Sequence, residues 1–452
     1  MDIQLTGEAE TDDASREILC GKMRAVGRTR GKGRAPMSDE SQKQAAKVME
    51  RCQKLAGFSE ETGCTTRTFL SPPMRDCHRE IAGWLDRLGI EAKIDAAGNL
   101  RGLYPAAASG ARRLLIGSHL DTVPNAGAYD GILGVLLAVS LLEALGGRKL
   151  AFEIEVIGFS EEEGVRFGTP YIGSRALVGT FDEELLKRKD ANGICVRRAI
   201  EEFGLKPAEI PDARLSDNAF GYLEFHIEQG PVLEQLGRPL GVVEAIAGQS
   251  RLEITFIGRA NHAGTTPMNL RHDAIAAAAE WITAVEREAK GTPGLVATVG
   301  RIQVKPGATN VIAGEARLSL DVRHKLDDVR TRAVETLLRK AEQIAERRGM
   351  IVRSNTQLDQ KAVAMNPFLA CQAGEAIRKA GCEPHAIVSG AGHDAMILAE
   401  KVPVAMIFLR TPGGISHSPA ENVEIGDVAK AIESGLHLLD LLTASPMAQR
   451  GA

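Results

Sequence analysis

The chain has 452 residues, of which 44% are hydrophobic and 25% are charged, values that are typical of a soluble globular protein. Its 55 Lys and Arg residues against 59 Asp and Glu residues give a formal net charge of −4. This balance argues against a nucleic-acid partner, because nucleic-acid-binding proteins usually carry a large basic excess. No apolar run approaches the roughly 18 residues that a membrane span needs, so we expect no membrane partner.

The seven cysteines are an odd number, and none of them forms a CxxC pair. This pattern is typical of unpaired thiols in a reducing compartment, so we expect a cytoplasmic protein. The absence of CxxC pairs also argues against a thiolate zinc site, so that any metal should be held by His and carboxylate side chains.

Residues 1–36 contain neither a periodic apolar face nor the apolar segment of a secretory signal. They are acidic first and then basic, ending in the run from Arg28 to Arg34. We favour a disordered tail, with Met37 as an alternative start of the protein. A nucleic-acid or targeting patch is the competing interpretation of the basic run.

From Ser38 onward, helical and strand patterns alternate, which predicts a mostly parallel α/β sheet. The expected helices cover residues 38–52, 74–88, 132–145, 367–379 and 427–442. The expected strands cover residues 90–95, 99–104, 114–119, 152–160 and 403–410. We assign residues 37–248 and 362–445 to this catalytic domain.

Residues 249–361 show a different pattern, which predicts an inserted lid domain. Strands are expected at 251–258, 295–304, 315–323 and 350–355, with helices at 273–290 and 326–348. Their order, β-α-β-β-α-β, is that of the ferredoxin-like split motif. Trp281 and the Ala276–Ala279 run are expected to lie in the core of this domain or in its interface.

Polar residues cluster at the ends of the predicted strands, where open α/β sheets bind ligands. His119 and Asp121 point the same way in extended chain, which suits either a metal ligand with an orienting carboxylate or a structural histidine. Asp130 precedes a helix, and local evidence favours a helix N-cap over a metal-bridging carboxylate. Two further histidines, His226 and His417, stand in similar polar segments.

Glu161, Glu162 and Glu163 follow directly after an apolar strand. A solvated acidic turn is the simple interpretation, but it does not explain why three mutually repelling carboxylates follow a buried strand. A bound metal would absorb the charge, and one Glu could then act as a general base.

Taken together, these segments resemble the dinuclear zinc amidohydrolases related to aminoacylases and carboxypeptidase G. Within that family the resemblance is to allantoate amidohydrolase, N-carbamoyl-L-amino acid hydrolase and β-ureidopropionase, over about residues 40–443. The motifs that carry it are GSHLDTV, YDG, EEEGVRFG, HIEQGPVLE, NHAGTTPM, ATNVI, DVR, GAGHDA and GGISHSPAE.

The resemblance implies a zinc-peptidase-like catalytic domain that binds two divalent ions, Zn or Mn. It implies that His119 and His226 bind one ion, that Glu163 and His417 bind the other, and that Asp130 bridges them. Glu162 would be the general base, and Asp121 would orient His119.

The resemblance also assigns roles on the lid. His262 would stabilise the oxyanion and, with Asn310, would reach the site of the partner subunit in a homodimer formed through the lid; a loop-capping role is the alternative for His262. Gln229, Asn310 and Arg323 would contact the substrate. Arg323 ends an alternating strand, where it is either a surface residue or a bidentate clamp on the substrate carboxylate. His393 and Asp394 lie near the site in relatives, without an assigned role.

The expected function is hydrolysis of a ureido group in a small carboxylate. Allantoate is favoured, giving ureidoglycine, ammonia and carbon dioxide in purine catabolism, with Gly392 and the GQSRLEITFIG segment as subfamily indications. N-carbamoyl-L-amino acid hydrolase is the alternative, followed by β-ureidopropionase. A non-catalytic binding protein would be favoured by loss of a ligand position or of Glu162, and neither is lost. A metal-dependent peptidase is a further alternative. Relatives of that type usually carry a carboxylate where this chain has His226, so His226 argues against it.

Overall fold

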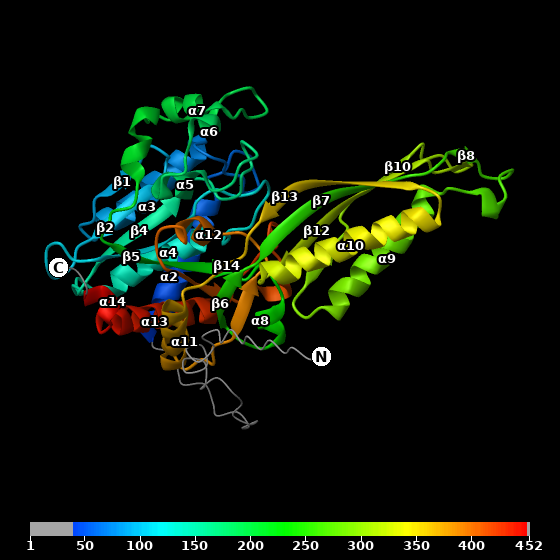
Figure 1. Cartoon of the computed structure of the whole chain (residues 1–452). Coiled ribbons are helices and arrows are strands. Elements are labelled where there is room, and N and C mark those ends of the chain that lie inside the picture. The colour runs from blue at the N-terminus through cyan, green and yellow to red at the C-terminus, as the bar shows by residue number, and fades with distance from the viewer. Residues whose placement is uncertain (1–38, 450–452) are drawn as a thin grey trace, which may run out of the picture. The chain divides into compact units, whose positions relative to one another are not determined.

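The computed structural model describes residues 39–449, so the tail predicted for residues 1–36 lies outside the described residues. Among the helices that it describes, none is long and apolar enough to cross a membrane. Within the described range, Cys52, Cys64, Cys77, Cys195 and Cys371 are free thiols. Two sheets organise the chain, one large and one smaller, and a separate two-stranded ribbon lies at the end of the smaller sheet that is remote from the larger one (Figure 1).

The larger sheet has nine strands in the order β1-β2-β4-β3-β5-β16-β6-β14, with β15 paired to β6. Its centre, β4-β3-β5-β16, is entirely parallel, and antiparallel strands flank it. The predicted mostly parallel α/β fold is therefore confirmed. The strands are β1 (Ala92–Ile94), β2 (Leu100–Tyr104), β3 (Arg113–His119), β4 (Glu153–Phe159), β5 (Ala219–Ile227), β6 (Leu240–Ile246), β14 (Val363–Ala364), β15 (Ala386–Ser389) and β16 (Val404–Leu409).

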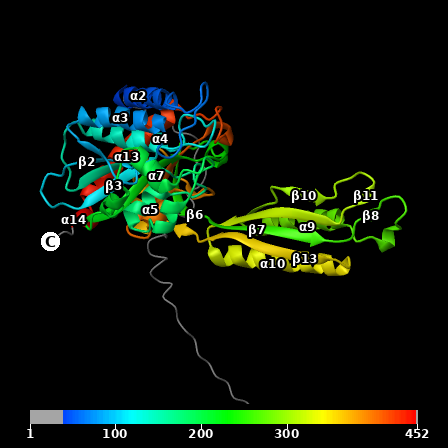
Figure 2. The same ribbon diagram turned by 90° about the horizontal axis from the view of Figure 1, so that it is seen from above.

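Helices cover both faces of this sheet, because its central strands are apolar on both sides. Alternate residues of β3 show this, since Leu114 and Ile116 join one core and Leu115 joins the other. The helix Ile132–Leu145 (α4) is apolar around its whole circumference because it lies between the sheet and two outer helices. Figure 2 shows α2, α3 and α4 on one side of the strands.

The remaining helices of this part are α2 (Asp39–Ala56), α3 (Pro72–Asp86), α5 (Ile172–Val178), α6 (Glu183–Lys187), α7 (Val196–Glu202), α8 (Val232–Gln235), α11 (Pro367–Lys379), α12 (Asp394–Leu398), α13 (Ile425–Thr443) and α14 (Pro446–Gln449). Short 3-10 turns cover Pro207–Ala213 and Pro412–Gly414. α2 and α13 pack on α4, while α12 joins the core of the opposite face.

The smaller sheet is formed by residues of the predicted insertion, and its elements follow the expected β-α-β-β-α-β order. The strand order β10-β12-β7-β13 is antiparallel throughout, with β9 at the end of β12. Two helices lie side by side on one face of this sheet (Figure 1), and Trp281 is buried in the core between the helices and the strands. The elements are β7 (Gly248–Ile257), β8 (Asn261–His262), a 3-10 turn (Met268–Leu270), α9 (Ala274–Gly291), β9 (Val296–Thr298), β10 (Ile302–Lys305), β11 (Val311–Ile312), β12 (Glu315–His324), α10 (Asp327–Arg347) and β13 (Ile351–Gln360).

Three details differ from the predicted elements. The single strand expected at 295–304 is two strands, β9 and β10, which pair with different parts of β12. The strand expected at 350–355 continues to Gln360, past a register shift between Thr356 and Leu358. β8 and β11 form a small ribbon of their own, which places His262 opposite Val311.

A buried histidine on α3 makes the stability of the larger domain depend on pH. His78 is 4% exposed, and its ring meets the ring of Phe203 edge-on at 5.8 Å. Within the described chain neither ring nitrogen has a hydrogen-bond partner. Burial, together with the charges of Arg67 and Arg75, lowers the pKa of His78 from 6.5 to about 3. His78 is therefore neutral in the folded protein at pH values where the unfolded chain takes up a proton.

We predict that this histidine lowers stability as pH falls. The depressed pKa means that protons bind the unfolded state first, so the stability contribution is present above pH 6.5 and is lost between pH 6.5 and about 3. Between about pH 7.5 and about pH 5, wild type should lose about 2 kcal/mol more unfolding free energy than His78→Phe, measured by urea denaturation.

Phe203→Leu is the matched control, because it disturbs the same packing and removes no titrating group. Its stability difference from wild type should be the same at both pH values. If the difference between His78→Phe and wild type is also constant, the pH effect assigned to His78 is wrong.

Candidate metal centre

The predicted site residues meet because they follow neighbouring parallel strands at the same edge of the sheet. His119 is the last residue of β3, and Glu161 to Glu163 begin two residues after β4. His226 lies near the end of β5, and His417 follows β16 in a loop. Since β4, β3, β5 and β16 are adjacent in this order, residues that are distant in sequence converge at their carboxyl ends.

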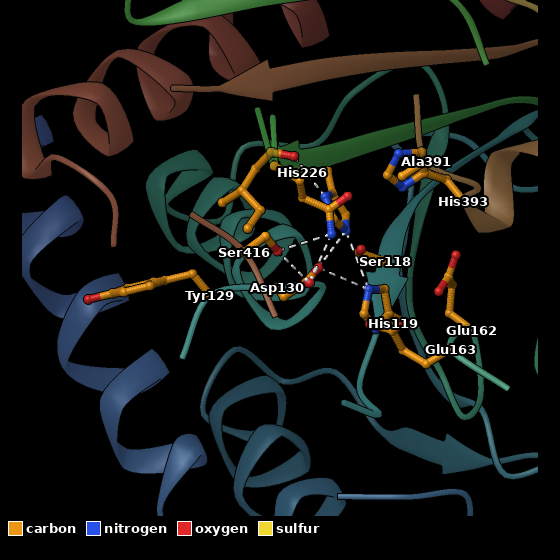
Figure 3. A network of polar contacts seen from close by, with 12 residues as sticks. Ser118, His119, Tyr129, Asp130, Glu162, Glu163, His226, Ala391, His393 and Ser416 are labelled. Atoms are coloured by element: carbon orange, nitrogen blue, oxygen red, sulfur yellow. Dashed lines mark hydrogen bonds and ion pairs between the residues drawn. The ribbon is translucent and has the colours of Figure 1, made fainter. Parts of the chain in front are cut away.

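Three imidazoles converge on the carboxylate of Asp130. Nε2 of His119 and Nε2 of His226 lie 3.6 and 3.2 Å from its Oδ1. Nε2 of His417 lies 3.3 Å from Oδ2 and 3.5 Å from Oε1 of Glu163. Figure 3 shows the His119 and His226 rings directed toward Asp130.

The other ring nitrogens fix the tautomers of two of these histidines. Nδ1 of His119 lies 3.0 Å from the carbonyl oxygen of Asp121, and Nδ1 of His226 lies 2.9 Å from that of Ile227. A carbonyl oxygen only accepts, so in each neutral ring Nδ1 carries the hydrogen and Nε2 carries the lone pair. The two Nε2 atoms, 3.3 Å apart, therefore face each other and Asp130 with electron pairs.

This donor set fits a divalent cation. Oδ1 of Asp130 is buried and accepts no hydrogen bond from any described residue. Imidazole nitrogen and carboxylate oxygen are the ligands that zinc prefers when thiolates are missing. Among the described residues, four groups of side chains have the spacing to hold an ion, and two of these groups share Asp130. These two are His119, Asp130 and His226, and Asp130, Glu163 and His417.

Asp121 joins the ends of two strands rather than facing solvent. Its carboxylate accepts hydrogen bonds from the backbone N–H groups of Glu162 and Glu163, at 2.9 and 3.0 Å. Its Oδ1 also lies 3.5 Å from Nδ1 of His119. One carboxylate therefore orients both the histidine and the acidic segment, in which Glu161 and Glu162 are buried and Glu163 is partly buried.

Burial dominates the electrostatics of the acidic segment. It raises the pKa of Glu162 well above the ordinary value of 4.5, with His119 opposing and Glu163 adding to the shift. Burial and the charge of Asp130 raise the pKa of Glu163 to about 7. Glu161 is fully buried, which raises its pKa as well. The solvated acidic turn is therefore excluded, and the segment gains from a nearby positive charge.

The helix-cap interpretation of Asp130 is wrong. The N-cap of α4 is Gly131, with φ of 69°, and no side chain caps the helix. The carboxylate of Asp130 instead accepts hydrogen bonds from Nε2 of Gln229 at 2.9 Å and from Oγ of Ser416 at 3.1 Å. The local pattern could not reveal this, because the partners come from distant segments.

Glu421 holds the loop that carries Asp130. One of its oxygens accepts from the backbone N–H groups of Tyr129 and Asp130, and the other accepts from Ser416. Sequence reasoning did not single out Glu421, although it lies in the GGISHSPAE motif. It fixes the position of Asp130 without contacting the three histidines.

His393 and Asp394 lie behind the cluster. The ring of His393 meets that of His226 edge-on, with centroids 4.5 Å apart, and its Nε2 lies 2.9 Å from Oγ of Ser389. Burial lowers the pKa of His393 well below 6.5 and raises the pKa of Asp394 well above 3.8. Glu224 accepts from Ser118 and from the backbone of Ala395 beside them. His393 thus supports the position of the His226 ring.

A cavity of about 850 Å³ joins the metal-ligating candidates to one end of the smaller sheet. Of the predicted residues, His119, Asp130, Glu162, Glu163, His226, Gln229, Arg323 and His417 line it. Gln249, Arg251, Gln357, Gln360 and Tyr171 line it as well, although sequence reasoning did not select them. Gln249 and Arg251 belong to the GQSR segment, so the strict alternation after Gln249 was an available signal.

His262 and Asn310 are not among the residues that line this cavity. Both are exposed and lie together on the β8–β11 ribbon, where the backbone N–H of Ala263 donates to the carbonyl of Asn310. Nδ1 of His262 accepts from the backbone N–H groups of Gly264 and Thr265, at 3.0 and 3.2 Å. The ring therefore caps its own turn, as the alternative interpretation held.

Comparison with known proteins agrees with this geometry. The model of the peptidase family M20/M25/M40 matches residues 115–440. The chain is 39% identical to an allantoate deiminase of Arabidopsis thaliana over 87% of this chain and 81% of the relative. It is 38% identical to an N-carbamoyl-L-amino acid amidohydrolase of Geobacillus stearothermophilus, over 84% and 93%. An amidase of the hydantoinase/carbamoylase family from Burkholderia multivorans superposes with a TM-score of 0.84 at 31% identity, over 89% and 98%.

We predict that the metal centre requires glycine at position 131, because the His119 ring leaves no room for a side chain there. A Cβ at this position would lie 2.4–2.5 Å from atoms of the His119 ring, so Gly131→Ala must displace the ring. It should weaken zinc binding by roughly 10- to 100-fold, as other changes that misplace a ligand do, measured by calorimetric titration of the metal-free protein.

Gly146→Ala is the matched control, because Gly146 also has positive φ, at 57°, but its Cβ would meet nothing within 4 Å. Gly146→Ala should lose roughly 1–2 kcal/mol of stability from its left-handed backbone. Gly131→Ala should lose more, because its ψ of −58° lies outside the left-handed helical region and its Cβ meets the His119 ring. Equal zinc affinity in the two variants would show that the His119 ring position does not control metal binding.

Proposed function

Because this chain belongs to the peptidase family M20/M25/M40, we propose that it is a metal-dependent amidohydrolase that cleaves a ureido C–N bond in a small carboxylate, with allantoate as substrate. The observation that carries the proposal is the convergence of three imidazoles and two carboxylates on one point at the edge of the sheet. In place of a nucleophilic side chain, this arrangement suits hydrolysis by activated water.

We assign His119 and His226 to one ion and Glu163 and His417 to the other, with Asp130 between them. The two clusters that share Asp130 support this division. The ions, Zn or Mn, would polarise the ureido carbonyl and activate water near neutral pH.

Glu162 is the general base of the proposed reaction. Its carboxylate is buried, lines the cavity and belongs to a cluster with His119 and Glu163. It takes a proton from the attacking water and returns it to the departing nitrogen. The raised pKa of Glu162, caused by burial, favours its holding that proton between the two transfers.

The proposed reaction balances without another reagent. The oxygen of water bonds to the ureido carbon, the C–N bond to the terminal nitrogen breaks, and ammonia leaves with the proton that Glu162 delivers. The remaining carbamate loses carbon dioxide and leaves the amine. For allantoate, the products are ureidoglycine, ammonia and carbon dioxide.

His262 supplies the oxyanion donor from the partner subunit. Because Nδ1 accepts two backbone N–H groups, the neutral ring carries its hydrogen on Nε2. Capping the turn therefore leaves His262 competent to donate, and its exposure leaves it accessible to another chain. Asn310, on the same ribbon, would accompany it.

Arg323 holds the substrate carboxylate. Its Nε and Nη2 donate to Asp321 at 2.8 and 2.9 Å, and its Nη1 donates to the carbonyl of Gly390 at 2.6 Å. A guanidinium has five N–H donors, so two remain for a substrate. The bidentate edge expected for the substrate is thus occupied by Asp321, and the substrate would use the remaining N–H groups. Gln229 would contact the substrate from the edge of the larger sheet.

Allantoate is favoured over an N-carbamoyl-L-amino acid, whose hydrolysis is the second candidate function because relatives with that name match equally well. Among the described residues that line the cavity, only Pro170, Leu358 and Ala391 are aliphatic beyond glycine. A hydrocarbon side chain would find few aliphatic partners there, whereas the second ureido group of allantoate would find hydrogen-bond partners. β-Ureidopropionate is a third possible substrate.

We further propose that residues 249–361 act as lid and dimerisation domain on the catalytic part, residues 37–248 and 362–445. The exposed His262 and Asn310, placed outside their own cavity, support a homodimer in which each lid serves its partner. The free thiols of Cys52, Cys64, Cys77, Cys195 and Cys371 support a cytoplasmic enzyme, and an allantoate substrate would place it in purine catabolism.

The proposed activity predicts ammonia release from allantoate by protein reconstituted with Zn or Mn, with about two ions bound per chain. The kcat/KM for allantoate should exceed that for N-carbamoyl-L-leucine, N-carbamoyl-L-methionine and β-ureidopropionate. Glu162→Gln should keep its metal content and lose nearly all activity, typically by 10²- to 10⁴-fold for a general base. If the metal-loaded protein releases ammonia from none of these compounds, the proposed function is wrong.

The proposed exchange of His262 predicts complementation between inactive chains. Mixed dimers of Glu162→Gln and His262→Ala should regain activity, because one of their two sites combines an intact Glu162 with an intact His262. The measurement is the allantoate turnover of purified heterodimers that carry two different affinity tags.

The control is a heterodimer of Glu162→Gln with Arg323→Ala, two residues that the proposal places in the same chain's site. Each of its sites has one defect, so it should stay inactive. Failure of the His262→Ala heterodimer to exceed this control would mean that His262 acts within its own chain or not at all.

A further inference from the structure

One end of the smaller sheet presents a row of long polar side chains, and strand register defines it. β12 pairs Arg323 with Gln249 of β7, and β7 pairs Gln249 with Gln360 of β13. Directly paired residues point to the same face, so Arg323, Gln249 and Gln360 form one line across three strands. In the next line on that face, Asp321 pairs with Arg251.

This face is the one that the helices leave uncovered. The alternate residues Leu252, Leu320 and Val322 point to the other face and are buried with Trp281 of α9. Arg323, Gln249 and Gln360 line the cavity that also contains Glu162 and the three histidines. The row therefore forms one wall of the cavity, and none of its residues is a metal-ligating candidate.

Asp321 organises the charges of this wall. It accepts hydrogen bonds from Arg323, from Nε2 of Gln249 at 2.8 Å and from Nε of Arg251 at 3.0 Å. Burial raises the pKa of Asp321, but the hydrogen bonds from Arg323, Gln249 and Arg251 outweigh it, so the pKa lies below its ordinary value. Two guanidinium groups against one carboxylate leave a single net positive charge, which matches one substrate carboxylate.

The amides match a different group. A glutamine side chain both donates and accepts, and so does a ureido group, which has a carbonyl oxygen and N–H donors. Among the described residues, Nε2 of Gln360 has only the sulfur of Met396 within reach, at 3.6 Å. A thioether is a weak acceptor, so the amide of Gln360 keeps most of its hydrogen-bonding capacity for a ligand.

We infer that Gln249 and Gln360 bind the ureido group that is not hydrolysed, while Arg323 and Arg251 bind the carboxylate beside it. This inference rests on the proposed function and adds the determinant that separates a substrate with two ureido groups from one with a single ureido group. A site built to hydrogen-bond a polar group discriminates strongly against an analogue that leaves the site's own polar groups unpaired.

The test compares allantoate with N-carbamoylglycine, which has a hydrogen atom in place of the second ureido group. Gln249→Leu and Gln360→Leu should each lower kcat/KM for allantoate by roughly 10- to 100-fold, the cost of one or two unmade hydrogen bonds. Their kcat/KM for N-carbamoylglycine should stay within about threefold of wild type, since the second ureido group is missing there. Gln303→Leu, at an exposed glutamine of β10 outside the cavity, is the matched control and should change neither value.

Equal losses on both substrates would overturn the inference, because they would indicate a general effect on Asp321 or on folding. Gln249→Leu removes a hydrogen bond to Asp321, so its effect alone could come from a displaced Asp321. Gln360→Leu separates the two causes, because Gln360 makes no hydrogen bond to Asp321 in the described chain. Unchanged discrimination in both variants would also overturn it.

Binding separates this inference from the proposed reaction. Calorimetric titration of zinc-loaded Glu162→Gln protein with allantoate and with N-carbamoylglycine requires no turnover. When Gln249→Leu or Gln360→Leu is combined with Glu162→Gln, the affinity for allantoate should fall and the affinity for N-carbamoylglycine should not. If wild type hydrolyses neither compound but this selective loss of affinity is observed, the proposed reaction is wrong and the inferred binding role of Gln249 and Gln360 is confirmed. If wild type is active and no selective loss occurs, only the inferred binding role is wrong.

Discussion

The site depends on an electrostatic constraint around Asp130. Two imidazoles whose hydrogens are held by backbone carbonyls direct their lone pairs at one carboxylate oxygen, and that oxygen accepts no hydrogen bond from the described residues. Burying uncompensated negative charge costs several kcal/mol per group. Without a cation, the histidines must supply the positive charge, and they hold the pKa of Asp130 well below its ordinary value although burial raises it. A divalent cation at this point would take over that role, which is why we regard metal binding as part of how this edge of the sheet is stabilised.

The fold meets this constraint with carboxylates that bind backbone rather than metal. Asp121 joins the end of β3 to the segment after β4, and Glu421 joins the Asp130 loop to Ser416. Each of these two carboxylates accepts hydrogen bonds from two backbone N–H groups, and these charge-assisted hydrogen bonds fix the geometry of the loops. The ligand candidates are thereby held by strands and by loops whose hydrogen-bond partners come from distant segments of the chain.

Sequence patterns predicted most elements and the convergence of the site, for identifiable reasons. The helices α9 and α10 have apolar stripes repeated over many residues, and residues that follow parallel strands must meet at one edge. β5, β6 and β15 were not among the predicted strands; β6 and β15 are short apolar runs, which have no distinctive period. The role of Asp130 could not be chosen locally, since its partners are set by tertiary contacts. The Arg323–Gln249–Gln360 row depends on strand register, which a sequence does not contain.

The two sheets divide the proposed work in a way that separates chemistry from specificity. The ligand candidates and Glu162 lie at the edge of the larger sheet, whereas the polar row lies on the smaller one and shares no hydrogen bond with them in the described chain. Substitutions in the row can therefore change which group beside the carboxylate is accepted without moving a metal ligand. Relatives named for allantoate and for N-carbamoyl-L-amino acids are equally similar to this chain, as expected if a few side chains on one sheet face, rather than the whole fold, select the substrate.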